Sequence, residues 1–174
     1  MSDIAEAAES SDPFSKQVAV TIAILTVFLA FIGNKGDNAK TEALLKTSEA
    51  ANQWGYYQSK SIKQNTTESE VSILSNLPGG GNQAKRDAAI AKVESSVKRY
   101  ELEKQEIKKK AESLELIARQ SELVNDRCDQ ASLVLQIGVI ICSISILSKW
   151  RLFWHIGMFL GTVGGVIGIT AFLL

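Results

Sequence analysis

The sequence predicts an all-α membrane protein with one N-terminal span, an extramembrane antiparallel helical hairpin or coiled coil, and a C-terminal two-span hairpin. Residues 131–147 and 152–174 are apolar runs whose one acidic or basic side chain is His155. At 1.5 Å per helical residue, each run is long enough, or nearly so, to cross a hydrocarbon core about 30 Å thick. Because lipid leaves backbone polar groups to bond internally, we expect two transmembrane helices joined by a short loop.

Charge and cysteine content exclude several classes. The 174 residues carry 19 basic and 19 acidic side chains, and residues 34–130 hold most of them with both signs mixed. A nucleic-acid-binding protein would need a basic face, so no nucleic-acid partner is expected. Cys128 and Cys142 would lie about 21 Å apart along one helix, too far for a bridge within the chain, and are expected to be packing thiols; an intermolecular bridge is the alternative.

The N-terminal segment predicts an acidic tail over residues 1–15 and a transmembrane helix over residues 16–33. Asp12 and Pro13 stand in the order of an N-cap and a first helical residue. The apolar run lacks the basic start and cleavage site of a secretory signal, so we interpret it as an uncleaved anchor. A buried soluble helix is the alternative. The glycines and polar residues of 33–37 predict a break after the span.

Residues 34–130 are predicted to form the extramembrane hairpin, with its turn at 78–82 in a Pro-Gly-Gly-Gly segment. The first arm is expected to run from about residue 37 to 64, and a short helix capped at 65–67 to follow it. Less polar residues spaced by three and four predict a weak packing stripe on this arm. The stripe consists of Leu44, Thr47, Ala51, Trp54, Gln58 and Ser61 or Ile62.

The second arm carries a stronger heptad seam, which continues without a helix breaker into the span at 131–147. The seam consists of Ile90, Val93, Val97, Tyr100, Lys104, Ile107, Ala111, Leu114, Ala118 and Ser121, followed by Asn125, Cys128, Ser132 and Leu135. Polar residues at such positions reduce stability and fix register. The seam fits packing against the first arm, a homo-oligomeric coiled coil, or both together.

No catalytic, cofactor-binding or metal-binding signature is found, so we expect no enzyme activity and no cofactor. His155 is the one histidine, and it lies in a segment typical of a membrane interface. The expected interface anchors are Trp150, Arg151, Trp154 and His155. Inside the spans the polar groups are mainly hydroxyls, which commonly bond to their own helix.

Glycines give the last span its clearest packing pattern. Gly157, Gly161 and Gly165 repeat every four residues, and Gly164 and Gly168 form a second register. Gly-x-x-x-Gly spacing lets helix backbones approach closely in lipid. We expect a tight helix contact along this face, with the preceding span or with another protomer as its partner.

A specific motif lies at residues 54–64, Trp-Gly-Tyr-Tyr-Gln-Ser-Lys-Ser-Ile-Lys-Gln. Together with residues 18–25 and 41–45, it resembles a family of small bacterial inner-membrane proteins described only as a domain of unknown function. The pattern of that family is similar to W-x-Y-Y-Q-A-K-S-I-K-Q, from which this chain departs by Ser59 and by a less basic hairpin loop. The resemblance implies bacterial origin, the inner membrane and three spans. The resemblance implies no activity for this chain.

The motif itself predicts a candidate interaction surface. Its members are Trp54, Tyr56, Tyr57, Gln58, Lys60 and Lys63, an aromatic and basic cluster within three helical turns. The functional hypothesis is a docking surface for a partner protein or lipid headgroups. The structural alternative is that Trp54 and Tyr57 pack on the long second arm, with the lysines in solvent.

Basic residues beside the spans predict the orientation in the membrane. Lys16, Lys149 and Arg151 favour a cytoplasmic N-terminus and hairpin loop, which would place residues 34–130 in the periplasm of a bacterial inner membrane. We expect contact with membrane lipid and assembly into a homo-oligomer, with other membrane subunits, or both. The predicted role is a scaffold or an accessory subunit. A channel or transporter component is the main alternative, and a sensor-like relay a weaker one.

Overall fold

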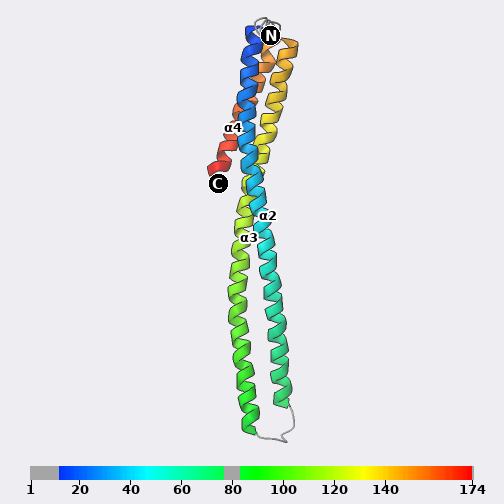
Figure 1. The fold of residues 1–174 in the computed structure, drawn as a ribbon, viewed down its shortest axis with the longest axis vertical. Helices are drawn as coiled ribbons and strands as arrows, with labels where there is room; N and C mark the ends of the chain where they lie inside the picture. The colour runs from blue at the N-terminus through cyan, green and yellow to red at the C-terminus, as the bar shows by residue number, and fades with distance from the viewer. Residues whose placement is uncertain (1–11, 77–82, 174) are drawn as a thin grey trace, which may run out of the picture. The chain divides into compact units, whose positions relative to one another are not determined.

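The computed structural model describes residues 12–76 and 83–173, and every element in these two ranges is an α-helix. The helices are α2 (Pro13–Asn76), α3 (Gln83–Ser148) and α4 (Arg151–Leu173) (Figure 1). The all-α prediction is therefore confirmed. Each of the three contains a window long and apolar enough to cross a membrane, which indicates a membrane protein. The predicted turn at 78–82 and most of the acidic tail lie outside the described residues.

The start of α2 follows the predicted capping chemistry. The helix begins at Pro13, whose missing N–H is no loss in a first turn. The backbone N–H of Phe14 donates to the Asp12 carboxylate at 3.4 Å, which satisfies one of the free donors of that turn. Asp12 and Pro13 are thus confirmed as N-cap and first helical residue.

The break predicted at residues 33–37 is wrong, because α2 continues through it as one helix of 64 residues. Instead of ending a helix, Gly36 allows α3 to approach α2 closely. A Cβ built on Gly36 would lie 2.9 Å from the Cβ of Cys128 in α3. The helix cap predicted at 65–67 is also wrong, because α2 continues through these residues and the Thr66 hydroxyl donates to the Ile62 carbonyl within it.

A short link joins α3 to α4. Lys149 has φ 51°, a left-handed conformation that residues other than glycine rarely adopt and that commonly ends a helix. The Ser145 hydroxyl donates to the Trp150 carbonyl at 3.2 Å, and the Phe153 N–H donates to the same carbonyl at 3.3 Å. These bonds fix the reversal from α3 into α4.

The chain divides into two compact units. The three-helix unit contains the chain up to Ala43 and from Gln120 onward, so it combines the first part of α2, the last part of α3 and all of α4. Its core brings together apolar side chains of all three helices. These are Phe14, Val18, Leu25, Ile32, Ala39, Val124, Cys128, Ala131, Leu135, Cys142 and Ala171.

The two-helix unit contains residues 44–119, in which α2 and α3 run antiparallel. The direction follows from side-chain contacts, because Trp54 bonds Glu115 whereas Gln64, further along α2, bonds Lys104. Side chains of the predicted α3 seam from Ile90 to Ser121 are all buried or half-buried. Few of the described residues in the two-helix unit are buried. They are Ala50, Ala111, Leu114 and Ala118.

The stripe predicted for the first arm is displaced by one residue from the packed face. Leu44 and Ile62, two of its anchors, are 65% and 66% exposed, whereas Ala50, next to the predicted Ala51, is 2% exposed. The face of α2 that packs on α3 is occupied mostly by small, aromatic and polar side chains, with the aliphatic Val71 and Leu74 at its end. The residues of this face are Ala43, Lys46, Ala50, Gln53, Trp54, Tyr57, Lys60, Ser61, Gln64, Thr67, Val71 and Leu74.

Candidate functional site

The aromatic part of the 54–64 motif lies between α2 and α3 in the two-helix unit. The indole Nε1–H of Trp54 donates to a carboxylate oxygen of Glu115 at 2.7 Å. The rings of Trp54 and Tyr57 meet edge to face, with centroids 5.7 Å apart. On its other side, Tyr57 presents its ring to the Lys104 ammonium, which lies 5.3 Å from the centroid. Both aromatic residues are half-buried and contact this chain itself.

Lys60 is the charged centre of the same interface. Its ammonium forms an ion pair with Glu103 of α3 and lies 5.3 Å from the centroid of the Tyr100 ring. Arg99 approaches the same two groups, with its Nε 3.7 Å from the Glu103 carboxylate and its guanidinium carbon 5.3 Å from the Tyr100 centroid. The hydrogen bond from Lys60 holds the pKa of Glu103 below its ordinary value of 4.5.

Lys104 of α3 contacts Gln64, the last residue of the motif. This lysine occupies a seam position of α3, where a hydrophobic residue would be usual. Its ammonium donates to the side-chain oxygen of Gln64 at 3.0 Å and lies 3.5 Å from the Glu101 carboxylate. The polar seam residue is therefore matched by polar partners, and this pairing fixes the register of α2 against α3.

The rest of the motif points into solvent. Tyr56 is 63% exposed, and Gln58 and Lys63 are exposed as well. Tyr56 and Lys63 are seven residues apart, which places them on one side of α2. The predicted interaction surface is thus split. Trp54, Tyr57 and Lys60 contact α3, whereas Tyr56, Gln58 and Lys63 remain available to a partner.

Large aliphatic side chains on the outer faces of the two-helix unit were not predicted as a site. Leu44, Ile62 and Ile73 of α2 are 65%, 66% and 63% exposed. Their separations of 18 and 11 residues return an α-helix to nearly the same face. On α3, Leu102 and Leu116 are 64% and 67% exposed and two heptads apart. These separations are visible in the sequence and are the signal that could have revealed this site.

The expected interface anchors lie at the start of α4, beside the start of α2 in the three-helix unit. The Trp154 ring meets Phe14 edge to face at 6.0 Å, and its indole N–H donates to the Thr21 hydroxyl at 3.2 Å. The Arg151 guanidinium carbon lies 5.7 Å from the centroid of the Phe14 ring. Trp150 is exposed and packs on Phe153, while His155 is exposed and tilts against Trp154.

The glycines of α4 have different neighbours. Gly157 and Gly164 lie against α3: a Cβ on the former would lie 2.9 Å from the Gly138 carbonyl oxygen, and on the latter 2.8 Å from Leu135. Gly161 and Gly168 lie against Leu25 and Ile32 of α2. Gly165 differs, because a Cβ there would meet nothing within 4 Å. Four glycines therefore make close contacts within the chain, and Gly165 faces open space.

Hydroxyl groups of the apolar segments donate to backbone carbonyls of this chain. The donors and acceptors are Thr21 to Gln17, Thr26 to Ile22, Ser143 to Val139, Ser145 to Trp150, Thr162 to Phe159 and Thr170 to Ile167. Within the described ranges, no group of three or more His, Cys, Asp or Glu side chains is placed to hold a metal ion.

Comparisons with known proteins give one family and no function. A search of curated proteins and a search of solved structures each returned no match. The family model described as a domain of unknown function (DUF4337) matches residues 14–174, which includes all three helices from the first turn of α2. The chain therefore belongs to the DUF4337 family.

Proposed function

We propose that this protein is a non-enzymatic integral membrane protein that assembles with copies of itself into a scaffold. One observation carries the proposal. On α2 the face toward α3 consists mostly of small, aromatic and polar side chains, whereas large aliphatic side chains such as Ile62 of α2 and Leu102 of α3 are exposed. An amphipathic helix normally buries its aliphatic face, because that burial supplies most of its tertiary stability.

The two-helix unit therefore leaves apolar surface on its outside as well as in the seam between its helices. The polar contacts between α2 and α3, such as the Lys60–Glu103 pair and the Lys104–Gln64 hydrogen bond, make the pairing specific. Exposed ion pairs of this kind contribute little free energy. The outer residues Leu44, Ile62 and Leu116 would contribute more if a neighbouring chain covered them.

A second copy is the partner that these features favour. Leu102 and Leu116 lie two heptads apart on one face of α3, with Lys109 at the intervening position, and apolar residues at heptad positions are a pattern through which identical helices pair. Charged side chains of both signs are mixed along the two-helix unit, so oppositely charged groups on two copies can face each other. Exposed Tyr56 and Lys63 remain available to a different membrane subunit, which would make the protein an accessory chain.

The proposed membrane arrangement places residues 16–33, 131–147 and 152–174 in the bilayer and the segment 34–130 outside it. The contact of Phe14 with Trp154 and Arg151 brings the starts of α2 and α4 to one end of the three-helix unit. Lys16, in the first turn of α2, and Lys149, in the loop, belong to that same end. We propose that this end is cytoplasmic, in a bacterial inner membrane.

Replacing outer leucines tests self-assembly. We compare the wild-type protein with the double variant Leu102→Ser, Leu116→Ser by light scattering that measures the protein mass in detergent. The control, Glu106→Ser with Lys110→Ser, changes two exposed charged residues of the same helix. We expect the leucine variant to fall to a smaller assembly while the control keeps the wild-type mass. Equal masses for all three proteins would refute assembly through this face.

A further inference from the structure

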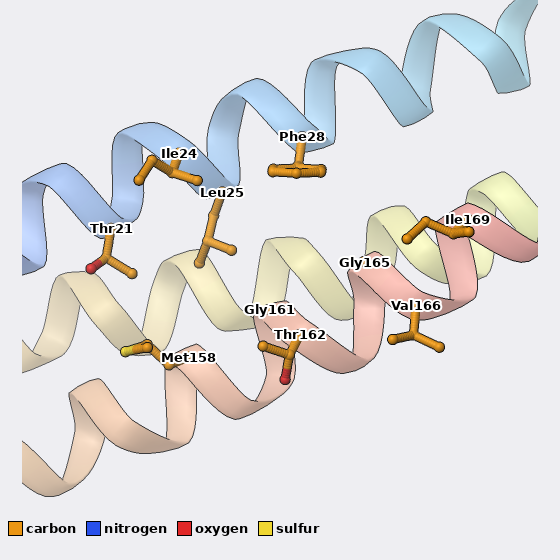
Figure 2. A pocket seen from close by; sticks show the side chains of 10 residues that line it. All are labelled: Thr21, Ile24, Leu25, Phe28, Met158, Gly161, Thr162, Gly165, Val166 and Ile169. Atoms are coloured by element: carbon orange, nitrogen blue, oxygen red, sulfur yellow. The ribbon is translucent and has the colours of Figure 1, made fainter.

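An open apolar groove runs between α2 and α4 in the three-helix unit. Its volume is about 460 Å³, within the range of ligand-binding pockets. Figure 2 shows side chains of both helices around it, with Gly161 and Gly165 along α4. The lining residues are Thr21, Ile24, Leu25, Phe28, Met158, Gly161, Thr162, Gly165, Val166 and Ile169.

Only two lining residues are polar, and neither requires an occupant for hydrogen bonding. The Thr21 hydroxyl donates to the Gln17 carbonyl at 2.9 Å and accepts from the Trp154 indole at 3.2 Å. The Thr162 hydroxyl donates to the Phe159 carbonyl at 2.7 Å. The groove therefore suits a chain of methylene groups, which neither donates nor accepts hydrogen bonds.

The ammonium group of Lys35 lies near one end of the groove. Lys35 follows Thr21 and Phe28 at intervals of seven residues, so it lies on the groove face of α2, two turns beyond Phe28. Its ammonium is 5.7 Å from the centroid of the Phe172 ring, which belongs to α4 one turn beyond Ile169. Among the described residues, no ion pair joins Lys35 to a carboxylate within 4.0 Å.

We propose that this groove binds one anionic phospholipid, with an acyl chain along Gly161 and Gly165 and the phosphate on Lys35. The groove supplies apolar contact over a length of both helices, and Lys35 supplies the complementary charge near the level where α4 ends at Leu173. A lysine placed there contacts a headgroup while the apolar lining contacts the tail. The scaffold proposal does not depend on this site.

Gly165 allows the groove to be filled without disturbing the helices. A Cβ at Gly165 meets nothing within 4 Å, and the same holds for Gly33 in α2. Gly33 lies more than a quarter turn away from the face that carries Lys35. Gly165→Phe should therefore occupy the groove, and Gly33→Phe is the matched control, with the same change of residue in the same unit.

Native mass spectrometry of the full chain, released from detergent after titration with phosphatidylglycerol or phosphatidylcholine, tests the proposal. We expect the wild type to bind one phosphatidylglycerol per chain about fivefold more tightly than phosphatidylcholine, the effect of one lysine at a membrane surface. Lys35→Gln should remove this preference, whereas Lys40→Gln, at an exposed lysine of the same helix, should retain it. Gly165→Phe should lose the bound lipid, and Gly33→Phe should keep it.

Three outcomes would overturn the proposal. Equal affinity of the wild type for the two lipids would show that Lys35 does not hold a headgroup. Retention of the lipid by Gly165→Phe would place the acyl chain elsewhere. A lower copy number of Gly165→Phe in the same spectra would show that a helix of a second chain fills the groove. If Gly165→Phe loses the lipid and keeps its copy number, the result supports the lipid site and has no bearing on the scaffold proposal.

Discussion

The indole of Trp54 in α2 donates a hydrogen bond of 2.7 Å to the carboxylate of Glu115 in α3, across 61 residues of sequence. The most distinctive aromatic residue of the motif is thereby assigned to the interior contact of the two-helix unit. A carboxylate acceptor makes this a charge-assisted bond, stronger than one between neutral groups. Trp54 thus couples the motif to the pairing of the two helices, whatever partner binds the outer face.

Trp54→Phe should lower the unfolding free energy by about 1 kcal/mol, less than the ~1.5–3 kcal/mol of a hydrogen bond to a charged group, because the pair is solvent-exposed. The phenyl ring keeps an aromatic contact with Tyr57 and removes only the donor. Thermal unfolding of the detergent-solubilised protein, followed by circular dichroism, measures the change. Tyr56→Phe, at an exposed ring, is the control and should unfold like the wild type. An unchanged Trp54→Phe midpoint would contradict the interior role.

Acid should weaken the Lys60–Glu103 contact in a predictable window. The pKa of Glu103 is lowered from 4.5 in the folded state, so its ionised form stabilises the fold above that value. The contribution is lost as the pH falls below 4.5 and through the lower folded-state pKa. Glu103→Gln should therefore melt below the wild type at pH 7, and the two midpoints should converge in acid. A difference that stays constant with pH would exclude this linkage, and Glu106→Gln serves as the control.

Two glycines of α4 should respond oppositely to alanine. Gly157→Ala places a Cβ 2.9 Å from the Gly138 carbonyl oxygen and against the Cys142 sulfur, so α3 and α4 must separate. The expected loss is about 1–2 kcal/mol, overpacking partly offset by the better helix propensity of alanine. Gly165→Ala meets open space and should gain up to about 1 kcal/mol. Unfolding midpoints in the same detergent measure both, and equal shifts would contradict the assigned contacts.

The loop between α3 and α4 offers a conformational test at Lys149, whose φ is 51°. Asparagine tolerates this left-handed conformation, whereas a β-branched residue does not. Lys149→Val should therefore be less stable than Lys149→Asn by about 1–2 kcal/mol, the cost of forcing a strained residue into this region. Both variants remove the same positive charge, so a difference in their midpoints isolates the backbone effect. Identical midpoints would mean that the loop relaxes to another conformation.

Hydrophobic patterning predicts α3 and α4 well, but it divides the continuous helix α2 into separate segments and predicts the packing unevenly. The α3 seam was identified because its residues repeat by three and four without a slip, and its members from Ile90 to Ser121 are buried or half-buried. The α2 stripe was displaced because its largest aliphatic residues, Leu44 and Ile62, face outward. A pattern method assigns such residues to the core. It cannot recognise a packed face built from residues such as Ala50, Lys60 and Gln64.

Glycine was the other source of error. Gly36 suggested a break, since glycine favours turns, but in the structure it permits Cys128 to approach α2. The two uses of glycine look alike in a single sequence and differ only in what lies opposite. The division of the motif into residues that contact α3 and residues that face solvent could not be predicted for the same reason. Trp54 and Tyr56 are equally aromatic, and only the position of α3 decides that one is covered and the other exposed.

Self-assembly is the central claim, and the composition of the native complex tests it most directly. The wild-type protein would be extracted from its own membrane with a nanodisc-forming polymer, purified, and analysed for mass and subunit identity. The proposal predicts a defined mass that is a multiple of the 18.9 kDa chain, with no other subunit present. A single chain per particle would contradict self-assembly. A stoichiometric foreign subunit with one copy of this chain would contradict it equally and identify an accessory role.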